Sequence, residues 1–86
     1  MSNYGTYIAG NSEMVDGVNT NLIVISLAVN EEGNSDVRIT EDNQFVEGFY
    51  DLTDEDSVEI FHRIQKENFG YIDTKITVDD LKKLRK

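Results

Sequence analysis

Apolar and β-branched runs predict strands in the N-terminal half of the chain. The strongest signal is Asn19–Asn30, because Leu22–Val29 is apolar on both faces, as a central strand requires. Before it we predict a short strand at Tyr4–Ala9 and a loop over Gly10–Asn21, which is rich in Gly, Asn and Ser. This part of the chain should supply an edge strand and the central strand of a sheet.

Two polar turns predict that the following strands are antiparallel. Asn30–Asn34 contains the Gly and Asn residues that tolerate positive φ, and Asp36–Glu41 should return beside the central strand. A second turn at Asp42-Asn43 precedes a further strand at Gln44–Tyr50. The glycine inside that strand, Gly48, indicates a bulge or a close approach of another group to the backbone.

The C-terminal part predicts two helices separated by a strand. Thr53 is a suitable N-cap for a helix that ends near Asn68, since three acidic residues follow it where the helix dipole favours carboxylates. Tyr71–Ile76 alternates as a final strand, and Thr77 can cap a terminal helix. The predicted class is α+β: an antiparallel meander of three to five strands with one longer helix and a short C-terminal helix.

The charge of the chain is strongly negative and unevenly distributed. Its 86 residues include 17 Asp and Glu against 8 Lys and Arg, for a net charge of -9. Through His62 there are 13 acidic residues and one base, Arg38, whereas Arg63–Lys86 contains 7 bases and 4 acids. Such a field repels nucleic acid and anionic membranes and attracts basic proteins. We therefore expect no direct binding of nucleic acid or membrane, and we interpret the basic tail as helix-dipole partners.

Length and composition restrict the function further. The chain has room for a single domain, residues 1–86, and little room for a buried catalytic cleft. It has no cysteine, which excludes disulfides and thiolate metal sites. The N-terminus lacks the pattern of a secretory signal, and the longest apolar run, Leu22–Val29, is too short to span a bilayer. We expect a cytoplasmic protein.

A dense set of carboxylates is the candidate partner-binding face. At the start of the predicted helix these charges also have a structural explanation, since the helix dipole favours them there. They do not match a calcium loop, because the alternating ligands, central Gly and distal Glu are out of register. We therefore predict no metal site and no cofactor. The candidate face consists of Glu31, Glu32, Asp36, Glu41, Asp42, Glu47, Asp51, Asp54, Glu55, Asp56 and Glu59.

No residue pattern indicates catalysis. The single histidine, His62, lies off the apolar stripe of its helix and has no second His or Cys nearby in the sequence, so we interpret it as a solvated side chain. Its replacement by alanine should then change stability by well under ~1 kcal/mol. No serine lies in a nucleophile-elbow context, and neither a P-loop nor a dinucleotide-binding glycine motif occurs. We predict that the protein is not an enzyme.

The N-terminal aromatic segment has two interpretations. Tyr4, Tyr7 and Ile8 can pair as an edge strand and fill the core, or they can form a self-association surface. A small domain with a limited core gains stability from a second copy. We predict a homodimer.

The segment Leu22–Phe49 resembles small acidic anti-CRISPR proteins that block type II CRISPR nucleases by occupying the DNA-binding groove. The likeness lies in the apolar strand, the turn Val29–Asn34, the strand through Val37 and the acidic stretch Glu41–Asn43. In size, charge and lack of cysteine the chain is also similar to phage-encoded DNA mimics, including inhibitors of HU-type nucleoid proteins. It departs from the anti-CRISPR pattern in its basic tail and in lacking a clear N-terminal helix.

Three functions follow from these observations. The first is a phage-type DNA mimic that binds a basic DNA-binding protein, an HU-type nucleoid protein or a CRISPR nuclease, in a bacterial host cell and blocks its DNA binding. The second is an acidic protein–protein interaction module whose apolar or strand-edge surface binds and whose charge only confers solubility. The third, a carboxylate-dependent hydrolase, needs a carboxyl group kept neutral in an apolar pocket, which no segment indicates.

Overall fold

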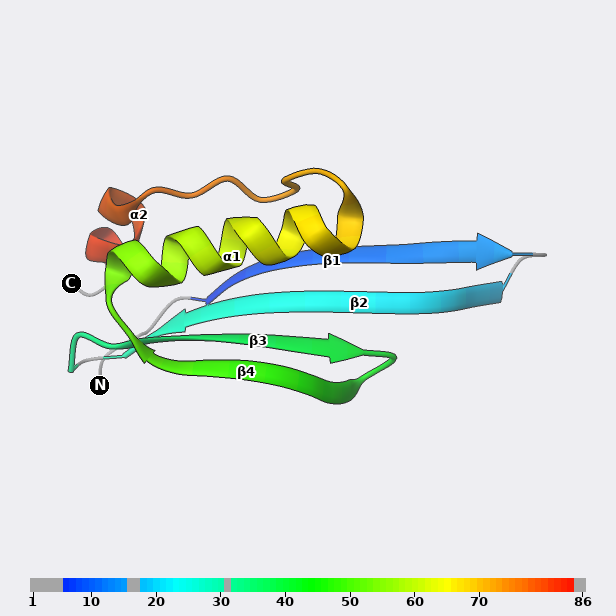
Figure 1. Cartoon of the computed structure of the whole chain (residues 1–86), viewed down its shortest axis with the longest axis horizontal. Helices are drawn as coiled ribbons and strands as arrows, with labels where there is room; N and C mark the ends of the chain where they lie inside the picture. The colour runs from blue at the N-terminus through cyan, green and yellow to red at the C-terminus, as the bar shows by residue number, and fades with distance from the viewer. Residues whose placement is uncertain (1–5, 16–17, 31, 85–86) are drawn as a thin grey trace.

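The computed structural model describes residues 6–15, 18–30 and 32–84, and for residues 11–15 and 18–21 it describes the backbone only. Four strands form one antiparallel sheet in sequential order: β1 (Thr6–Val15), β2 (Val18–Val29), β3 (Ser35–Glu41) and β4 (Gln44–Leu52). Helix α1 (Asp54–Phe69) lies across one face of the sheet, and α2 (Val78–Leu84) packs beside its first turns (Figure 1). The predicted α+β meander is confirmed.

The first hairpin is longer than the sequence pattern predicts. The expected loop at Gly10–Asn21 is wrong, because β1 continues to Val15 and pairs with β2 from Gly10↔Val24 to Val15↔Val18. Small and polar residues can occupy these positions because the ladder is made by backbone N–H and C=O groups. The hairpin of β1 and β2 consequently extends past the end of α1 (Figure 1).

The core lies between the sheet and the helices. Alternate residues of β2 and β3 point to α1, and Phe61 and Ile64 of α1 point back to the sheet. Ile76 and Leu81, from the segment after α1, complete this layer. The buried apolar side chains are Ala9, Ile25, Leu27, Val29, Val37, Ile39, Phe61, Ile64, Ile76 and Leu81.

Both helices begin as the sequence predicts. The Oγ1 atom of Thr53 accepts a hydrogen bond from the N–H of Asp56 at 3.1 Å, and α1 ends at Gly70, whose φ of 84° is left-handed. At α2, Thr77 and Asp80 form a reciprocal cap: the N–H of Thr77 donates to Asp80 Oδ2 at 2.8 Å, and the N–H of Asp80 donates to Thr77 Oγ1 at 3.3 Å. Neither described helix is long and apolar enough to cross a membrane.

The segment between the helices is not the strand predicted at Tyr71–Ile76. Side chains of α1 bind its backbone in place of a neighbouring strand. The buried Gln65 accepts from the N–H groups of Asp73 and Thr74, both at 2.8 Å, and donates to the carbonyl of Thr74 at 3.0 Å. His62 accepts from the N–H of Ile76 at 3.1 Å. Since these backbone groups already have partners, the segment needs no strand partner.

The hairpin of β3 and β4 combines a tight turn with a bulge. Asp42 and Asn43 have φ values of 53° and 68°, the two positive φ angles of a type I′ turn. One step further the register shifts, because Ile39 pairs with Glu47 while Thr40 pairs with Phe45. Val46 is therefore the extra residue of a β-bulge.

Gly48 permits a close approach on the face of β4 that is turned away from α1. A Cβ atom at this position would collide with the ring of Tyr50. The guanidinium of Arg38, the cross-strand partner of Gly48, lies 5.5 Å from the centre of the same ring. The close approach predicted at Gly48 is confirmed.

Candidate protein-binding surface

The predicted acidic residues separate into two groups at opposite ends of the β3–β4 hairpin. The first group, called here the helix-end group, surrounds the β2–β3 turn and the start of α1. Pairing of Ser35 with Leu52 brings the end of β4 to this turn. The described members are Glu32, Asp36, Asp51, Asp54, Glu55, Asp56 and Glu59. Glu31 lies outside the described residues.

The second group, the turn-end group, consists of Glu41, Asp42 and Glu47. Along β3, Asp36 of the helix-end group and Glu41 of the turn-end group are five residues apart, about 17 Å at ~3.4 Å per residue. The candidate residues thus lie at the two ends of the hairpin instead of forming one compact cluster.

Some of these carboxylates have structural roles. The N–H of Asp51, a residue with a φ of 57°, donates to Asp36 Oδ1 at 3.0 Å. Asp42 pairs with Leu22 twice, because its Oδ1 accepts from the N–H of Leu22 at 3.0 Å and its own N–H donates to the carbonyl of Leu22 at 2.8 Å. The exposed Glu32, Glu55 and Glu59 are better placed for a partner.

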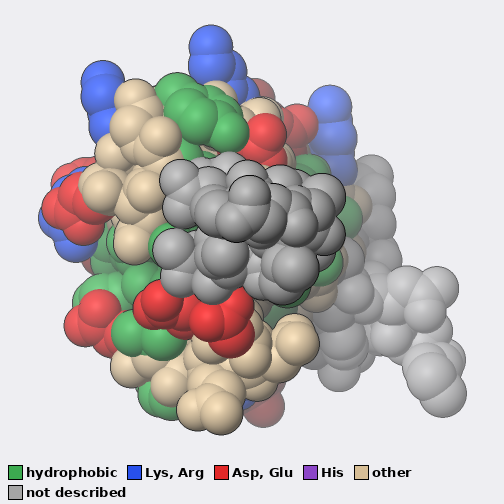
Figure 2. All heavy atoms as spheres, turned by 90° about the vertical axis from the view of Figure 1, so that its right-hand side faces the viewer, with side chains coloured by type: hydrophobic (Ala, Val, Ile, Leu, Met, Phe, Trp, Pro, Cys, Tyr) green, Lys and Arg blue, Asp and Glu red, His purple; other side chains and the backbone are tan. Residues whose placement is uncertain are grey.

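Cations border the acidic surface. Arg38, the single base between residues 31 and 59, lies over Tyr50 on the sheet face opposite α1. The exposed Lys82 and Lys83 stand on α2, which packs beside the first turns of α1. Viewed from the hairpin end of the molecule, Lys and Arg side chains project mainly at the helix side, where acidic side chains also lie, and further acidic side chains lie lower down, over the sheet (Figure 2).

His62 is a structural residue, and the interpretation as a solvated side chain is wrong. Its ring is half-buried, and its Nε2 atom accepts the hydrogen bond from Ile76. Nε2 must therefore be unprotonated. Burial lowers the pKa of His62 below its ordinary value, which favours the same neutral form. Its acceptor role could not be foreseen, because Ile76 is 14 residues away in the sequence.

Tyr7 and Ile8 do not share a surface. Tyr7 is half-buried against the core, and burial, followed by the charge of Asp80, raises the pKa of its hydroxyl. Ile8 points to the opposite face of the sheet, where 58% of it is exposed. Tyr4 lies outside the described residues. Of the self-association candidates, the described part of the chain leaves Ile8 on the open face.

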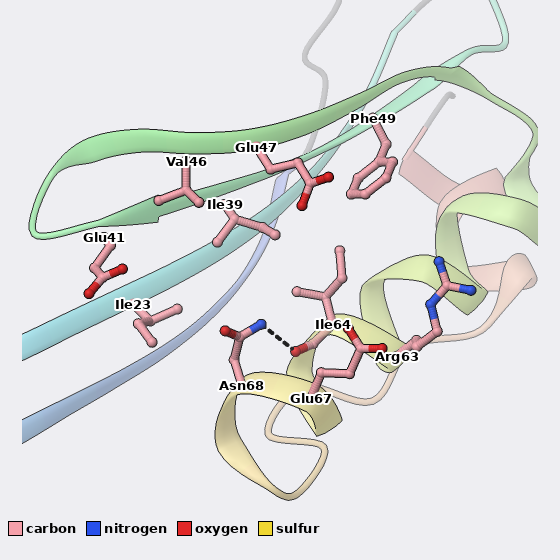
Figure 3. Close-up of a pocket in the computed structure, with 10 residues that line it drawn as sticks. All are labelled: Ile23, Ile39, Glu41, Val46, Glu47, Phe49, Arg63, Ile64, Glu67 and Asn68. Carbon is pink, nitrogen blue, oxygen red and sulfur yellow. Dashed lines mark hydrogen bonds between the residues drawn. The ribbon is translucent and has the colours of Figure 1, made fainter.

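A groove of about 540 Å³ opens between the C-terminal half of α1 and the turn end of the β3–β4 hairpin (Figure 3). Aliphatic and aromatic side chains from three strands and the helix form its floor, and charged and polar side chains from both sides form its rim. The floor residues are Ile23, Ile39, Val46, Phe49 and Ile64. The rim residues are Glu41, Glu47, Arg63, Glu67 and Asn68.

The bulge shapes this groove. Consecutive residues of a regular strand point to opposite faces, but Val46 and Glu47 both point into the groove (Figure 3). Sequence reasoning selected Glu41 and Glu47 and missed the others, including Arg63 and Glu67. The alternation of β4 contains no signal for the bulge, because the bulge depends on its register with β3.

Within the described part of the chain, no group of three or more His, Cys, Asp or Glu side chains could hold a metal ion. Comparison with protein-family models, curated proteins and solved structures finds no match for this chain. The chemistry available at the described surface is negative charge on fixed elements and an open apolar groove.

Proposed function

We propose that this protein is a non-enzymatic DNA mimic that binds a basic DNA-binding protein through its acidic surface and blocks DNA binding. The observation that carries the proposal is the placement of carboxylates at both ends of the β3–β4 hairpin and at the start of α1. An HU-type nucleoid protein and a type II CRISPR nuclease are the candidate partners, in the cytoplasm of a bacterial host cell.

The spacing of the two acidic groups supports this function. A span of about 17 Å corresponds to about five phosphate steps along one strand of duplex DNA, at ~3.4 Å each. A DNA-binding protein gains much of its affinity by releasing counterions from a row of charges. Carboxylates held at both ends of a hydrogen-bonded hairpin present fixed negative charge without the ordering cost of a flexible acidic tail.

We predict that the protein displaces duplex DNA from its partner and that the complex weakens steeply with salt. The test is an electrophoretic competition assay with a purified HU-type protein and, separately, with a type II CRISPR nuclease, at several salt concentrations. The pair Glu55→Lys and Glu59→Lys should raise the protein concentration needed for half displacement by about tenfold or more. The pair Glu13→Lys and Asp16→Lys changes the net charge equally and should have a much smaller effect.

Equal effects of the two charge-reversal pairs would contradict the assignment of the surface. A complex that forms with the same affinity at low and high salt would favour the second function, an interaction module whose charge only confers solubility. The exposed apolar side chains of β1 and β4 favour that alternative. They are Ile8, Phe45, Val46 and Tyr50, with 58%, 60%, 54% and 47% of their surfaces exposed.

A homodimer remains a prediction, now with a different surface. Ile8, Phe45 and Tyr50 lie on the sheet face that α1 does not cover, so two copies could pack these faces together. Sedimentation equilibrium should then give about twice the 9.8 kDa of one chain. Phe45→Lys should shift the equilibrium to monomer, and a monomeric wild-type protein at all accessible concentrations would exclude the dimer.

A further inference from the structure

The floor of the groove exposes apolar surface on an ordered scaffold. Ile39 and Ile64 are nearly buried, with 7% and 4% exposed, and they fix the base of the groove through the main core. Above them Val46 is 54% exposed, because the bulge turns it inward where α1 does not reach it. An aliphatic side chain from a partner would contact Val46, Phe49 and Ile23 and remove their apolar surface from water.

The rim of the groove is acidic. Glu41 and Glu47 enter from the hairpin and Glu67 from α1, against the single guanidinium of Arg63. The side-chain amide of Asn68 donates to the carbonyl of Ile64 at 2.9 Å, so this amide already has a hydrogen-bond partner within the helix. The charged rim residues thus carry three negative charges and one positive charge around an apolar floor.

An apolar floor with an acidic rim favours some classes of ligand over others. Nucleic acid and anionic lipid are repelled by the rim and by the net charge of -9. A second copy of the chain would carry the same negative charge into the groove. A segment with aliphatic side chains on one side and Lys or Arg on the other complements both the floor and the rim.

We propose that the groove binds a basic amphipathic segment of the partner protein. An aliphatic side chain occupies the floor against Val46 and Phe49, and a lysine or arginine of the same segment contacts Glu41, Glu47 or Glu67. This inference rests on the proposed function, because it names the part of the basic partner that is recognised. It adds specificity, since the acidic groups alone attract any basic protein whereas the floor requires an apolar side chain beside the charge.

The test uses the full chain and two synthetic peptides of equal positive charge. One is an amphipathic peptide of lysine and leucine with the leucines at helical spacing, and the other replaces every leucine with serine. Titration into ¹⁵N-labelled protein should shift the amide signals of Ile23, Val46 and Phe49 with the first peptide, and the serine peptide should bind about tenfold more weakly.

Val46 and Phe45 provide a matched pair of variants. They are adjacent and similarly exposed, but their side chains point in different directions. Val46 points into the groove, whereas Phe45, the cross-strand partner of Thr40, points to the opposite face of the sheet. Val46→Lys should weaken binding of the lysine–leucine peptide about tenfold or more, since it removes apolar contact and adds positive charge. Phe45→Lys adds the same charge and should leave the affinity within about twofold.

Three results would overturn the inference. The first is equal binding of the two peptides with signal shifts confined to the helix-end group, a result that leaves the proposed DNA mimicry standing. The second is equal weakening by Val46→Lys and Phe45→Lys. The third is loss of a homodimer in sedimentation with Val46→Lys alone, which would assign the groove to a second copy. Groove binding of the peptide by a protein that displaces no DNA would instead overturn the proposed function alone.

Discussion

Replacement of Gln65 by leucine is expected to lower the free energy of unfolding by about 3 kcal/mol, because three backbone groups lose their hydrogen bonds to its buried amide at ~1 kcal/mol each. The amide of Gln65 is fully buried and forms hydrogen bonds of 2.8–3.0 Å with the backbone of Asp73 and Thr74. Leucine has a similar volume, so the loss would come from unsatisfied polar groups and not from a cavity.

Thermal and urea unfolding, followed by circular dichroism, measure this effect. Lys66→Leu is the matched control, since Lys66 is the next residue of α1 and is exposed. It should change stability by about 0.5 kcal/mol or less. A Gln65→Leu protein as stable as wild type would show that the segment after α1 is held by its apolar residues, Ile76 and Leu81, and that the amide contributes little.

Gln65→Glu separates the donor from the acceptor role of this side chain. A buried carboxylate cannot donate to the carbonyl of Thr74, and burial raises its pKa above that in the unfolded chain. The folded state then binds more protons than the unfolded state, so the stability of this variant relative to wild type should increase as the pH falls. A stability difference that does not depend on pH would contradict this role of the amide.

Replacement of His62 by alanine is expected to lower the free energy of unfolding by about 1–2 kcal/mol, because it leaves the N–H of Ile76 without its acceptor. This value replaces the change of well under ~1 kcal/mol predicted for a solvated side chain. His62→Gln can place an amide oxygen near the position of Nε2 and should restore part of the loss. If both variants are as stable as wild type, water satisfies this N–H and the hydrogen bond is dispensable.

The pH dependence of stability provides a separate test of His62. The folded-state pKa of His62 lies below its ordinary value of 6.5, so the unfolded chain takes up the proton first as the pH falls. The contribution of the neutral ring is complete above about pH 6.5 and is lost as the pH falls through the lowered folded-state pKa. Urea unfolding of wild type and His62→Gln from pH 8 to about pH 5 should show this loss in wild type alone. If the free energy of unfolding changes with pH by the same amount in both proteins, the assigned role of the neutral ring is contradicted.

Local patterns in the sequence were sufficient for most of the secondary structure. Thr53 and Gly70 delimit α1 because capping depends on residues within one turn of the helix end. The hairpin at Asp42–Asn43 follows from two residues that tolerate positive φ. The β1 extension was missed because Gly10–Asn21 is rich in turn-forming residues, whereas the extension is held by its pairing with Val18–Val24 of β2.

The position of the candidate surface was only partly contained in the sequence. The net charge and the concentration of acids between residues 31 and 59 follow from composition alone. Their division into two groups about 17 Å apart along β3 depends on strand direction and length, at ~3.4 Å per residue. The placement of Lys82 and Lys83 beside α1 depends on how α2 packs, which no periodicity within α2 specifies.

The sequence by itself determined an acidic α+β chain with its turns, caps and apolar strand faces, because each of these depends on neighbours in the chain. The tertiary structure decided which distant groups meet. It brought Gln65 and His62 to the backbone of the segment that the alternation of Tyr71–Ile76 predicted as a strand. It also set the register that turns Val46 into the groove, since a bulge exists only relative to the partner strand.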